Sequence, residues 1–310
     1  MVTEPVGNSV QDALVAPTVG EPVDGDLSRE LEDVAHRAWP PLREQRVGGW
    51  VLRESAGSSR RGNSVWARGD VGDIADALDT VGQFYATAGL PPTVQITPVS
   101  MPSAIHEVLD AAGFDDTGPT DVCIADLGEI GERLVVGATG NVPARPGSSR
   151  TAAVNGHRTI LLDTVGDTWL DVAGQVLATF AGQRTGTLGV LANLTMPAAY
   201  VLCMVDGVPM AVGRGTVDGD WLGVYSMATV PAARGRGAAR TVLARLAAWA
   251  VDAGASRAYL QVEQTSTAAR RLYAALGFRP VYRYSYRRLH AAGVPGTPPH
   301  ERRCASLQRP

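Results

Sequence analysis

The chain has 310 residues, of which 45% are hydrophobic and 19% are charged. This length and composition are typical of a globular protein that can form two domains, and they exclude an intrinsically disordered chain. The formal net charge of −3 lacks the basic excess that attracts polyanions, so we expect no nucleic-acid partner.

The cysteines and the apolar segments indicate the cellular setting. Cys123, Cys203 and Cys304 are odd in number and far apart, and neither a Cys-x-x-Cys motif nor a histidine pair at metal spacing occurs. No apolar stretch approaches the roughly 20 residues that cross a bilayer, and the first 20 residues do not have the pattern of a signal peptide. We therefore expect a reduced, cytoplasmic protein without metal and without a membrane partner.

In the first half, helix and strand patterns alternate, which predicts an α/β arrangement. Apolar residues recur at helical spacing over residues 27–39, and the prolines that follow end this helix. The further elements expected in this half are strands at 49–54 and 64–68, a helix at 73–87, a strand at 93–98, a helix at 103–112 and a strand at 121–126.

The second half predicts a hairpin, a further strand and two helices. Asp206-Gly207 separates two apolar runs, which is a strong hairpin signal. The elements expected here are a strand at 157–162, a helix at 168–180, strands at 200–205, 208–215 and 221–229, a helix from 235 to about 251, a strand at 257–263, a helix from Ser266 to Gly277 and a strand at 281–288.

The most informative stretch is the turn between the strand 221–229 and the helix that follows. Arg234-Gly235-Arg236-Gly237 leads directly into an amphipathic helix, so a helix N-terminus lies beside glycines and arginines. Unpaired N–H groups and a partial positive charge make such an end an anion site, and glycines let a phosphate approach the main chain. The pattern favours a pyrophosphate cradle over an ordinary strand-to-helix turn with solvated arginines.

Three motifs in the second half occur in the order found in one family. They are Arg-x-x-Gly-x-Ala at 234–239, LeuGlnValGlu at 260–263 and LeuTyrAlaAlaLeuGlyPhe at 272–278. Together with the order of elements, they resemble a GNAT acetyltransferase domain over about residues 154–288. The first half, with GlyGlyTrpValLeuArgGluSer, ArgArgGlyAsnSerVal and GlyLeuProProThrValGln, is similar to the tandem-domain bacterial GNAT proteins described as unconventional N-acetylglutamate synthases.

This resemblance implies an α/β (α+β) fold of two tandem GNAT-like domains, each with a mixed, mostly antiparallel sheet flanked by helices. The expected organisation is a flexible tail at 1–26, a degenerate first domain at 27–127, a linker at 128–153, a catalytic domain at 154–291 and a flexible tail at 292–310.

Two features suggest that the first domain has lost its chemistry. Its corresponding turn carries Asp70 and Asp73, which would repel a phosphate. AlaAlaGlyPhe at 111–114 echoes AlaLeuGlyPhe at 275–278, and Leu109 stands where the second copy has Tyr273. The echo indicates an internal duplication, although so short a helix ending also arises by coincidence.

By resemblance, acetyl-CoA is the co-substrate and lies along the end of the third strand. Its pantetheine arm would pair with the main chain of Met227, Ala228 and Thr229. Its pyrophosphate would lie on the turn and first helical residues, which are Arg234, Gly235, Arg236, Gly237, Ala238, Ala239 and Arg240. A neutral amine would attack the thioester directly, and a strand N–H would stabilise the oxyanion.

The same resemblance suggests roles for three side chains. Tyr273 would protonate the departing thiolate, and its alternative is a core aromatic. Relatives often use a glutamate as the base where Gln261 stands here, so Glu263, on the same side of the strand, is the candidate base; its alternative is an exposed strand-end carboxylate. Ser266 either binds pantetheine or caps the helix.

The predicted function is N-acetylation of a primary amine on a small molecule, with L-glutamate implied by the resemblance. Arg214 would meet such a carboxylate in a bidentate pair, but a solvated surface arginine is the favoured interpretation. The alternatives are a protein, peptide or antibiotic amine as acceptor, and a non-catalytic acyl-CoA sensor. A homodimer is also considered.

Overall fold

The computed structural model describes residues 24–136, 151–154 and 157–289. The strands of this part of the chain form one mixed sheet of 12 strands, in the order β1-β2-β3-β4-β12-β5-β11-β10-β9-β8-β7-β6. Most neighbouring strands pair antiparallel, and β3 with β4 and β10 with β11 pair in parallel. The expected α/β class with a mixed, mostly antiparallel sheet is confirmed.

The elements of the first half are α2 (Gly25–Arg37), β1 (Arg43–Val47), β2 (Trp50–Glu54), η1 (Arg61–Asn63), β3 (Val65–Ala67), α3 (Ile74–Ala86), β4 (Thr93–Ile96), α4 (Ile105–Ala111) and β5 (Phe114–Asp126). Those that follow are α5 (Leu127–Val136), β6 (Thr151–Val154), β7 (His157–Leu162), α6 (Asp167–Gly174), α7 (Ala178–Gly182), α8 (Arg184–Ala192), β8 (Ala198–Val205), β9 (Val208–Asp218), β10 (Trp221–Thr229), η2 (Pro231–Ala233), α9 (Ala238–Asp252), β11 (Arg257–Glu263), α10 (Thr267–Ala275) and β12 (Arg279–Leu289).

The two halves repeat one arrangement. In each half an antiparallel hairpin, β1–β2 or β8–β9, is followed by two parallel strands joined through a helix, β3-α3-β4 or β10-α9-β11. A second helix and a last strand complete each half, as α4-β5 or α10-β12. This topology supports the duplication suggested by the AlaAlaGlyPhe and AlaLeuGlyPhe echo.

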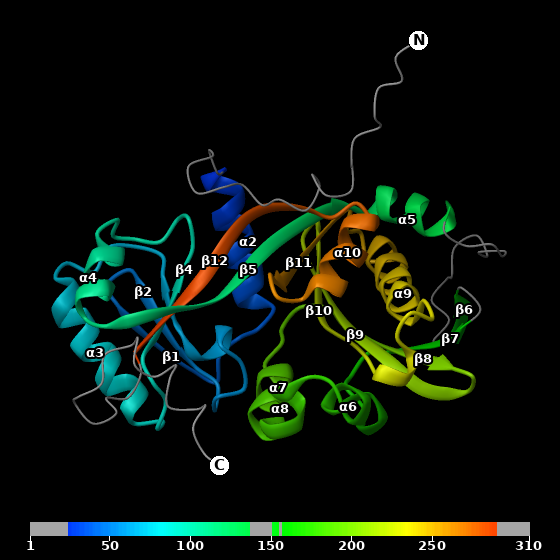
Figure 1. Cartoon of the computed structure of the whole chain (residues 1–310), viewed down its shortest axis with the longest axis horizontal. Helices are drawn as coiled ribbons and strands as arrows, with labels where there is room; N and C mark the ends of the chain where they lie inside the picture. The colour runs from blue at the N-terminus through cyan, green and yellow to red at the C-terminus, as the bar shows by residue number, and fades with distance from the viewer. Residues whose placement is uncertain (1–23, 137–150, 155–156, 290–310) are drawn as a thin grey trace, which may run out of the picture.

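The last strands of the two halves are exchanged. β5, from the first half, pairs with β11 of the second half, and β12, from the second half, pairs with β4 of the first. β5 and β12 also pair with each other and run side by side through the middle of the molecule (Figure 1). One continuous sheet therefore crosses the boundary between the predicted domains 27–127 and 154–291, whose division stays a prediction.

Helices are exchanged in the same way. The apolar face of α2, from the first half, packs with residues of β10, β11, β5 and β12, among them Trp221 and Tyr259. Trp221 Nε1 donates to Glu30 of α2 at 2.7 Å. In return, Gly186 of α8 lies so close to Ser55 and Ala56 that a side chain there would clash with them. Each half thus contributes a helix that covers part of the other.

Several predicted elements differ from those observed. The helix expected at 168–180 is divided into α6 and α7. The expected linker contains the helix α5, while its residues 137–150 lie outside the described part. The predicted tails, and Cys304 with them, also lie outside it, apart from residues 24–26. The strand expected at 121–126 begins already at Phe114, where Arg287 of β12 donates to the Phe114 carbonyl. β1 and α8 were not predicted, because β1 is almost wholly exposed and α8 is rich in glycine and threonine.

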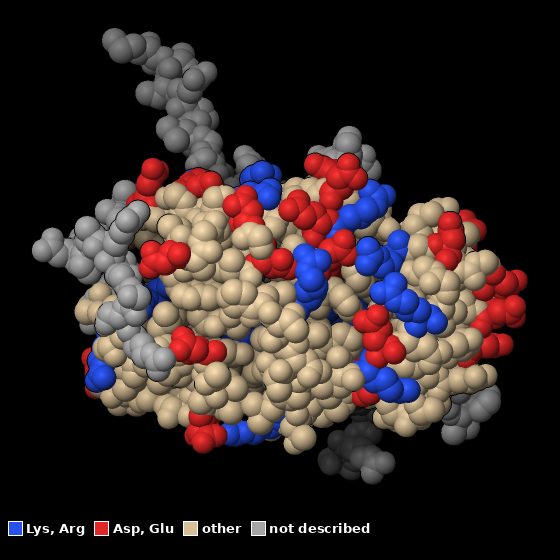
Figure 2. All heavy atoms as spheres, turned by 180° about the vertical axis from the view of Figure 1, so that it is seen from behind, with Lys and Arg blue, Asp and Glu red and all other residues tan. Residues whose placement is uncertain are grey.

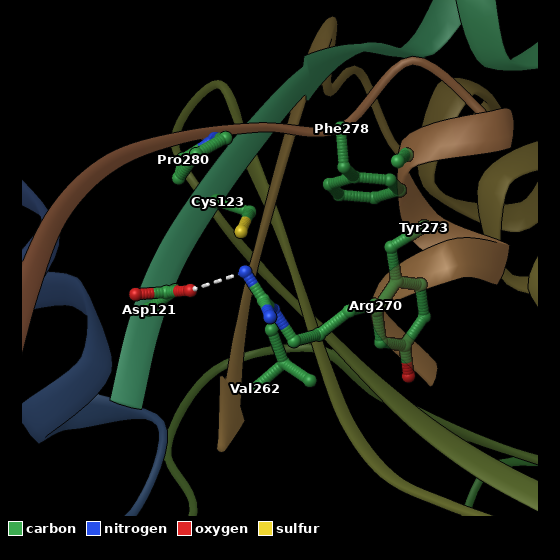
Figure 3. A pocket seen from close by; sticks show the side chains of 8 residues that line it. Asp121, Cys123, Val262, Arg270, Tyr273, Phe278 and Pro280 are labelled. Atoms are coloured by element: carbon green, nitrogen blue, oxygen red, sulfur yellow. Dashed lines mark ion pairs between the residues drawn. The ribbon is translucent and has the colours of Figure 1, made fainter. Parts of the chain in front are cut away.

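The exchanged strand β5 carries a buried carboxylate. Asp121 accepts from Arg283 Nε of β12 at 2.8 Å, and its other oxygen lies 3.4 Å from Arg270 Nη2 of α10 (Figure 3). Only 1% of Asp121 is exposed, so its charge depends on these two arginines from the second half. The pair of contacts connects the first-half strand to the helix and strand of the other half.

We predict that Asp121→Ala lowers the free energy of unfolding by about 3 kcal/mol, because it removes a buried charge and leaves Arg270 and Arg283 without this carboxylate. Urea denaturation measures the loss. Glu129→Ala is the matched control, since it breaks an exposed pair with Arg133 and should cost about 1 kcal/mol or less. Equal losses in the two variants would show that Asp121 does not hold the halves together.

Candidate functional site

The strands β10 and β11 separate at their carboxyl ends. They pair in parallel only as far as Val224 and Leu260. Just beyond, the pairing of β10 with β9 shifts register between Tyr225 and Ala228, and Ser226 adopts a φ of 51°, which is uncommon for a residue other than glycine. Beyond this bulge β10 and β11 are no longer paired, and we call the place where their facing main chains have no strand partner the opening between them.

Residues predicted to pair with a pantetheine lie on this diverging end of β10. Met227 lies in the bulge and is half-buried. Beyond the bulge, Ala228 and Thr229 pair with β9 again, opposite Val212 and Ala211. The side of β10 that faces β11 has no strand partner from Tyr225 onward. Its main-chain groups are therefore available to an extended ligand.

The glycine-arginine turn follows at once. The short helix η2 ends at Ala233, and Gly235 and Gly237 then adopt φ values of 75° and 80°, which only glycine takes without strain. Because of this left-handed backbone, α9 begins at Ala238. The predicted start at Gly235 was therefore wrong by three residues. Neither glycine has an atom within 4 Å of where a Cβ would be, so the main chain here is open on the surface.

The helix end beside this turn is firmly placed. Ala238 is buried in the main core, together with Val242, Leu243 and Leu246 of the same helix. The N-cap residue is Gly237, which has no side chain. No side-chain oxygen therefore competes with a ligand for the amides of the first helical turn. In the first half, by contrast, Asp73 caps α3 by accepting from Ala75 and Asp76. The carboxylate of Asp73 thus already occupies the donors of the corresponding helix end there.

Each arginine of the turn contacts the protein while remaining accessible. Arg236 donates to Asp206 at 2.6 Å, Arg240 donates to the Arg133 carbonyl at 3.2 Å, and Arg234 approaches the Thr229 carbonyl at 3.4 Å. His157 Nε2 lies 2.8 Å from the Arg236 carbonyl, so β7 also supports the turn. His157 and Asp206 border a hollow of about 290 Å³ beside it. His157 was not predicted as a site residue, because it lies at the end of a strand and belongs to no motif.

Tyr273 lies on the buried face of α10. Its ring packs edge-on against Phe278 at 5.8 Å and lines a narrow pocket with Cys123 and Val262, in which about 10 Å³ remains, roughly the space of one water molecule (Figure 3). Burial, with a smaller contribution from Cys123, raises the pKa of its phenol well above the ordinary 10. The hydroxyl therefore keeps its proton at neutral pH and is able to act as an acid or a hydrogen-bond donor.

The other two candidate side chains are exposed. Glu263 extends from the end of β11 and forms an ion pair with Arg60 of the first half. Ser266 occupies the N-cap position of α10, but its side chain makes no capping hydrogen bond. The Ser266 hydroxyl therefore does not cap this end of the helix.

The structure corrects the favoured interpretation of Arg214. This residue is fully buried instead of solvated, because α2 and the residues after it cover this face of β9. Both of its Nη atoms donate to the Ala38 carbonyl, at 3.2 and 3.1 Å, and its guanidinium lies over the rings of Trp39 and Tyr225. With both Nη atoms engaged, the bidentate carboxylate pair considered for Arg214 does not form in this arrangement.

A buried polar cluster lies next to the opening and was not predicted. Arg61 of η1 donates to Glu32 of α2 at 3.1 Å and to Gln261 of β11 at 3.2 Å. Tyr282 and Gln95 also donate to Glu32, at 2.7 and 2.9 Å. These residues come from five elements that are distant in the sequence. Arg61 also belongs to a polar loop without periodicity, so no sequence pattern brings them together.

The potential in this region is positive. His36, on α2, has its pKa lowered from 6.5 to about 3, first by burial and then by Arg53, Arg61, Arg68 and Arg37. A carboxylate oxygen of Glu44 lies 3.4 Å from the ring and would favour the charged form, but burial and four arginines outweigh it. Across the rear surface of the molecule, in contrast, acidic and basic side chains are intermingled (Figure 2).

Within the described residues, no three His, Cys, Asp or Glu side chains are grouped as metal ligands would be. Cys123 and Cys203 are free and buried. No helix of residues 24–136, 151–154 and 157–289 is both long and apolar enough to cross a bilayer.

Comparison with known sequences gives a match over residues 27–287 to the family described as "Probable histone acetyltransferase Rv0428c C-terminal". The chain is also 25% identical over 263 residues to the "Uncharacterized N-acetyltransferase YobR" of Bacillus subtilis (strain 168), a match that covers 84% of this chain and 98% of that protein. The family match extends through both halves of the chain.

Two solved structures have the same fold. A GCN5-related N-acetyltransferase from Kribbella flavida aligns with a TM-score of 0.58 at 17% identity, covering 86% of this chain and 96% of that one. A tandem GNAT protein from the clavulanic acid biosynthesis pathway aligns with a TM-score of 0.55 at 13% identity, covering 91% and 92%. The expected tandem GNAT-like fold is confirmed.

We predict that His36 makes folding stability depend on pH. Its folded-state pKa lies below the unfolded value of 6.5, so only the unfolded chain gains a proton as the pH falls from about 6.5 toward 3. Its contribution to stability is therefore complete above pH 6.5 and decreases by at most about 1.4 kcal/mol per pH unit below it.

Urea denaturation at pH 7.5, 6.0 and 5.0 measures this slope. His36→Gln should flatten it relative to the unchanged chain, and His106→Gln, at an exposed histidine of α4, should not. If both variants retain the same slope, the positive potential around His36 is too weak to keep it neutral.

Proposed function

Because the chain belongs to the Rv0428c C-terminal family and is a GNAT acetyltransferase, we propose that it moves the acetyl group of acetyl-CoA to a primary amine of a small molecule. The observation that carries the proposal is the opening between β10 and β11, with the glycine-arginine turn directly after β10. A thioester and its diphosphate need these two features side by side.

The residues of the turn fit a diphosphate. Open main chain at Gly235 and Gly237, first-turn amides without a capping side chain, and three arginines offer many donors and positive charge in one place. Arg234, Gly235, Arg236, Gly237, Ala238, Ala239 and Arg240 would hold the pyrophosphate, and Met227, Ala228 and Thr229 the pantetheine arm. The exposed Ser266 is available to the same arm.

In the proposed reaction the amine attacks the thioester carbonyl directly, and amides freed by the β10 bulge stabilise the oxyanion. Tyr273, whose phenol is protonated at neutral pH, supplies the proton to the departing thiolate. Glu263 takes the proton of the amine, through water, once its pair with Arg60 loosens. No covalent intermediate on the protein is needed.

The acceptor is the least constrained part of the proposal. L-Glutamate follows from the sequence resemblance, while the family description names a probable histone acetyltransferase, which implies a lysine side chain. A peptide or antibiotic amine and a sensor without turnover are the alternatives. Release of free thiol from acetyl-CoA with amino acids, small amines and a lysine-rich peptide separates all of these outcomes.

We predict that Gly237→Ala weakens acetyl-CoA binding about tenfold or more, because a methyl group enters the space above the turn and the left-handed backbone is strained. Isothermal titration with acetyl-CoA measures the effect. Gly254→Ala is the matched control: it lies just beyond the other end of α9, with a φ of 96° and equally open surroundings.

Both variants should lose a similar amount of stability, about 1 kcal/mol, because both place alanine in left-handed backbone. Only Gly237→Ala should lose affinity. Unchanged binding in that variant, or no binding of acetyl-CoA to the original chain, rejects the proposed site.

We predict that Tyr273→Phe lowers kcat by about 10²-fold while KM for acetyl-CoA changes less than threefold, since only the proton donor is removed. Thiol release under saturating substrates measures kcat. Tyr200→Phe serves as a control, because Tyr200 is also a buried tyrosine with a raised pKa but lies on β8. A kcat that is the same in Tyr273→Phe and the original chain would leave Tyr273 as a core aromatic.

A further inference from the structure

The buried polar cluster beside the opening contains several donors without a partner. Among the described residues, Trp39 Nε1, Ser55 Oγ, Arg61 Nη2, Arg214 Nε and Gln261 Nε2 are inaccessible to solvent and make no hydrogen bond. Leaving one such buried donor unpaired costs about 1–3 kcal/mol. Four of these side chains are more than nine-tenths buried: Trp39, Ser55, Arg61 and Arg214.

These donors belong to one continuous region. A Cβ built on Gly62 would lie 2.9 Å from Ser55 Oγ and 3.0 Å from Trp39 Nε1, so these two atoms flank the residue next to Arg61. Arg214 packs over both Trp39 and Tyr225, and Tyr225 is hydrogen-bonded to Tyr259 on the neighbouring strand. Arg61 in turn contacts Gln261, two residues beyond Tyr259.

The region borders the place where acetyl transfer would occur. Tyr225 and Gln261 are the first residues of β10 and β11 beyond the last paired positions, Val224 and Leu260. Burial raises the pKa of Tyr225, while its bond to Tyr259 and the charges of Arg214 and Arg61 oppose that rise, so both guanidiniums are close enough to act on it. The unpaired donors of Arg61 and Gln261 therefore lie at the opening, on the side of η1.

The cluster also has an excess of positive charge. Arg53, Arg61 and Arg214 are buried there, and Glu32 is the buried carboxylate that faces them. Arg53 does not reach Glu32 directly; it donates to Ser64 and Gln95. Burying a cation without a counter-charge costs folding free energy, and hydrogen-bond donors cannot pair with one another. What the cluster lacks is a group with negative charge and acceptor oxygens.

We infer that the acceptor amine carries a carboxylate, which this cluster binds through Arg61 Nη2 and Gln261 Nε2, so that the first half of the chain selects the substrate. This inference rests on the proposed function and specifies its acceptor. A planar carboxylate suits a guanidinium and an amide as donors. A lysine-rich peptide, which carries further positive charge, would be repelled.

The exposed end of the same face supports this arrangement. Arg60, next to Arg61, pairs with Glu263, two residues after Gln261 on β11, and both are accessible to solvent. A small acceptor that enters here meets Glu263, the candidate base, before its carboxylate reaches Arg61 and Gln261. The amine and the carboxylate are thereby distinguished by two groups of opposite charge.

Thiol release with matched acceptors tests the inference. L-Glutamate is compared with its diamide and β-alanine with β-alaninamide, so that each acid is matched by an amide that has no carboxylate. Each is also compared with a lysine-rich peptide, at equal concentration and ionic strength. The enzyme itself contains no lysine, so its own side chains cannot act as competing amines. We expect at least one acid to exceed its amide tenfold in kcat/KM; equal rates for acid and amide, or a preference for the peptide, would overturn the inference.

Two variants locate the binding group. Arg61→Lys keeps the charge that Glu32 requires but loses the free Nη2, and Gln261→Leu removes the amide at similar volume. Each should raise KM for the acid about tenfold or more, with KM for acetyl-CoA changed less than twofold. Gln45→Leu, at an exposed position of the edge strand β1, is the matched control and should change neither.

A titration without turnover separates failure of this inference from failure of the proposed function. Succinate and glutarate, which carry carboxylates but no amine, should raise the melting temperature of the original chain and of Gln45→Leu, and should do so much less in Gln261→Leu. Equal shifts in all three proteins, or none, overturn the carboxylate site. Absence of thiol release with every amine counts against the transferase alone.

Discussion

The exchange of β5 and β12 is the constraint on which the rest of the structure depends. Because each strand completes the sheet of the other half, neither half keeps a free edge at the junction. Asp121 reinforces this exchange, since its buried charge is balanced by arginines on α10 and β12. The exchange also fixes α2 and η1 against β10 and β11, and so brings first-half side chains to the opening between those strands.

The local features of the candidate site could be predicted from sequence because they are local in the chain. The glycine-arginine turn, the helix after it and Tyr273 each lie within a few residues of the motif that indicated them. Even there, the start of α9 was misplaced by three residues, since the left-handed conformations of Gly235 and Gly237 leave no trace in an apolar pattern. The order of the strands followed from hairpin signals and alternation, but the exchange did not.

The buried cluster could not be predicted for a physical reason. Glu32, Arg61, Arg214 and Gln261 are separated by tens of residues, and a charged residue in a polar loop is normally exposed. Arg214 shows the error most clearly: a lone arginine on a hairpin strand suggested a solvated surface, yet Ala38 and Trp39 cover it. Burial of such residues is decided by the packing of the other half of the chain, which no single segment encodes.

The two halves share one topology but differ at the N-terminus of the corresponding helix. Where α9 offers free amides, α3 has Asp73, whose carboxylate occupies the equivalent donors. The first half therefore retains the topology, but its corresponding helix end is capped by a carboxylate. Its contribution lies instead in Arg53, Arg61 and Glu32, which present an incompletely balanced charge to the second half. We infer that this half of the chain helps to select the acceptor, while the glycine-arginine turn of the other half holds acetyl-CoA.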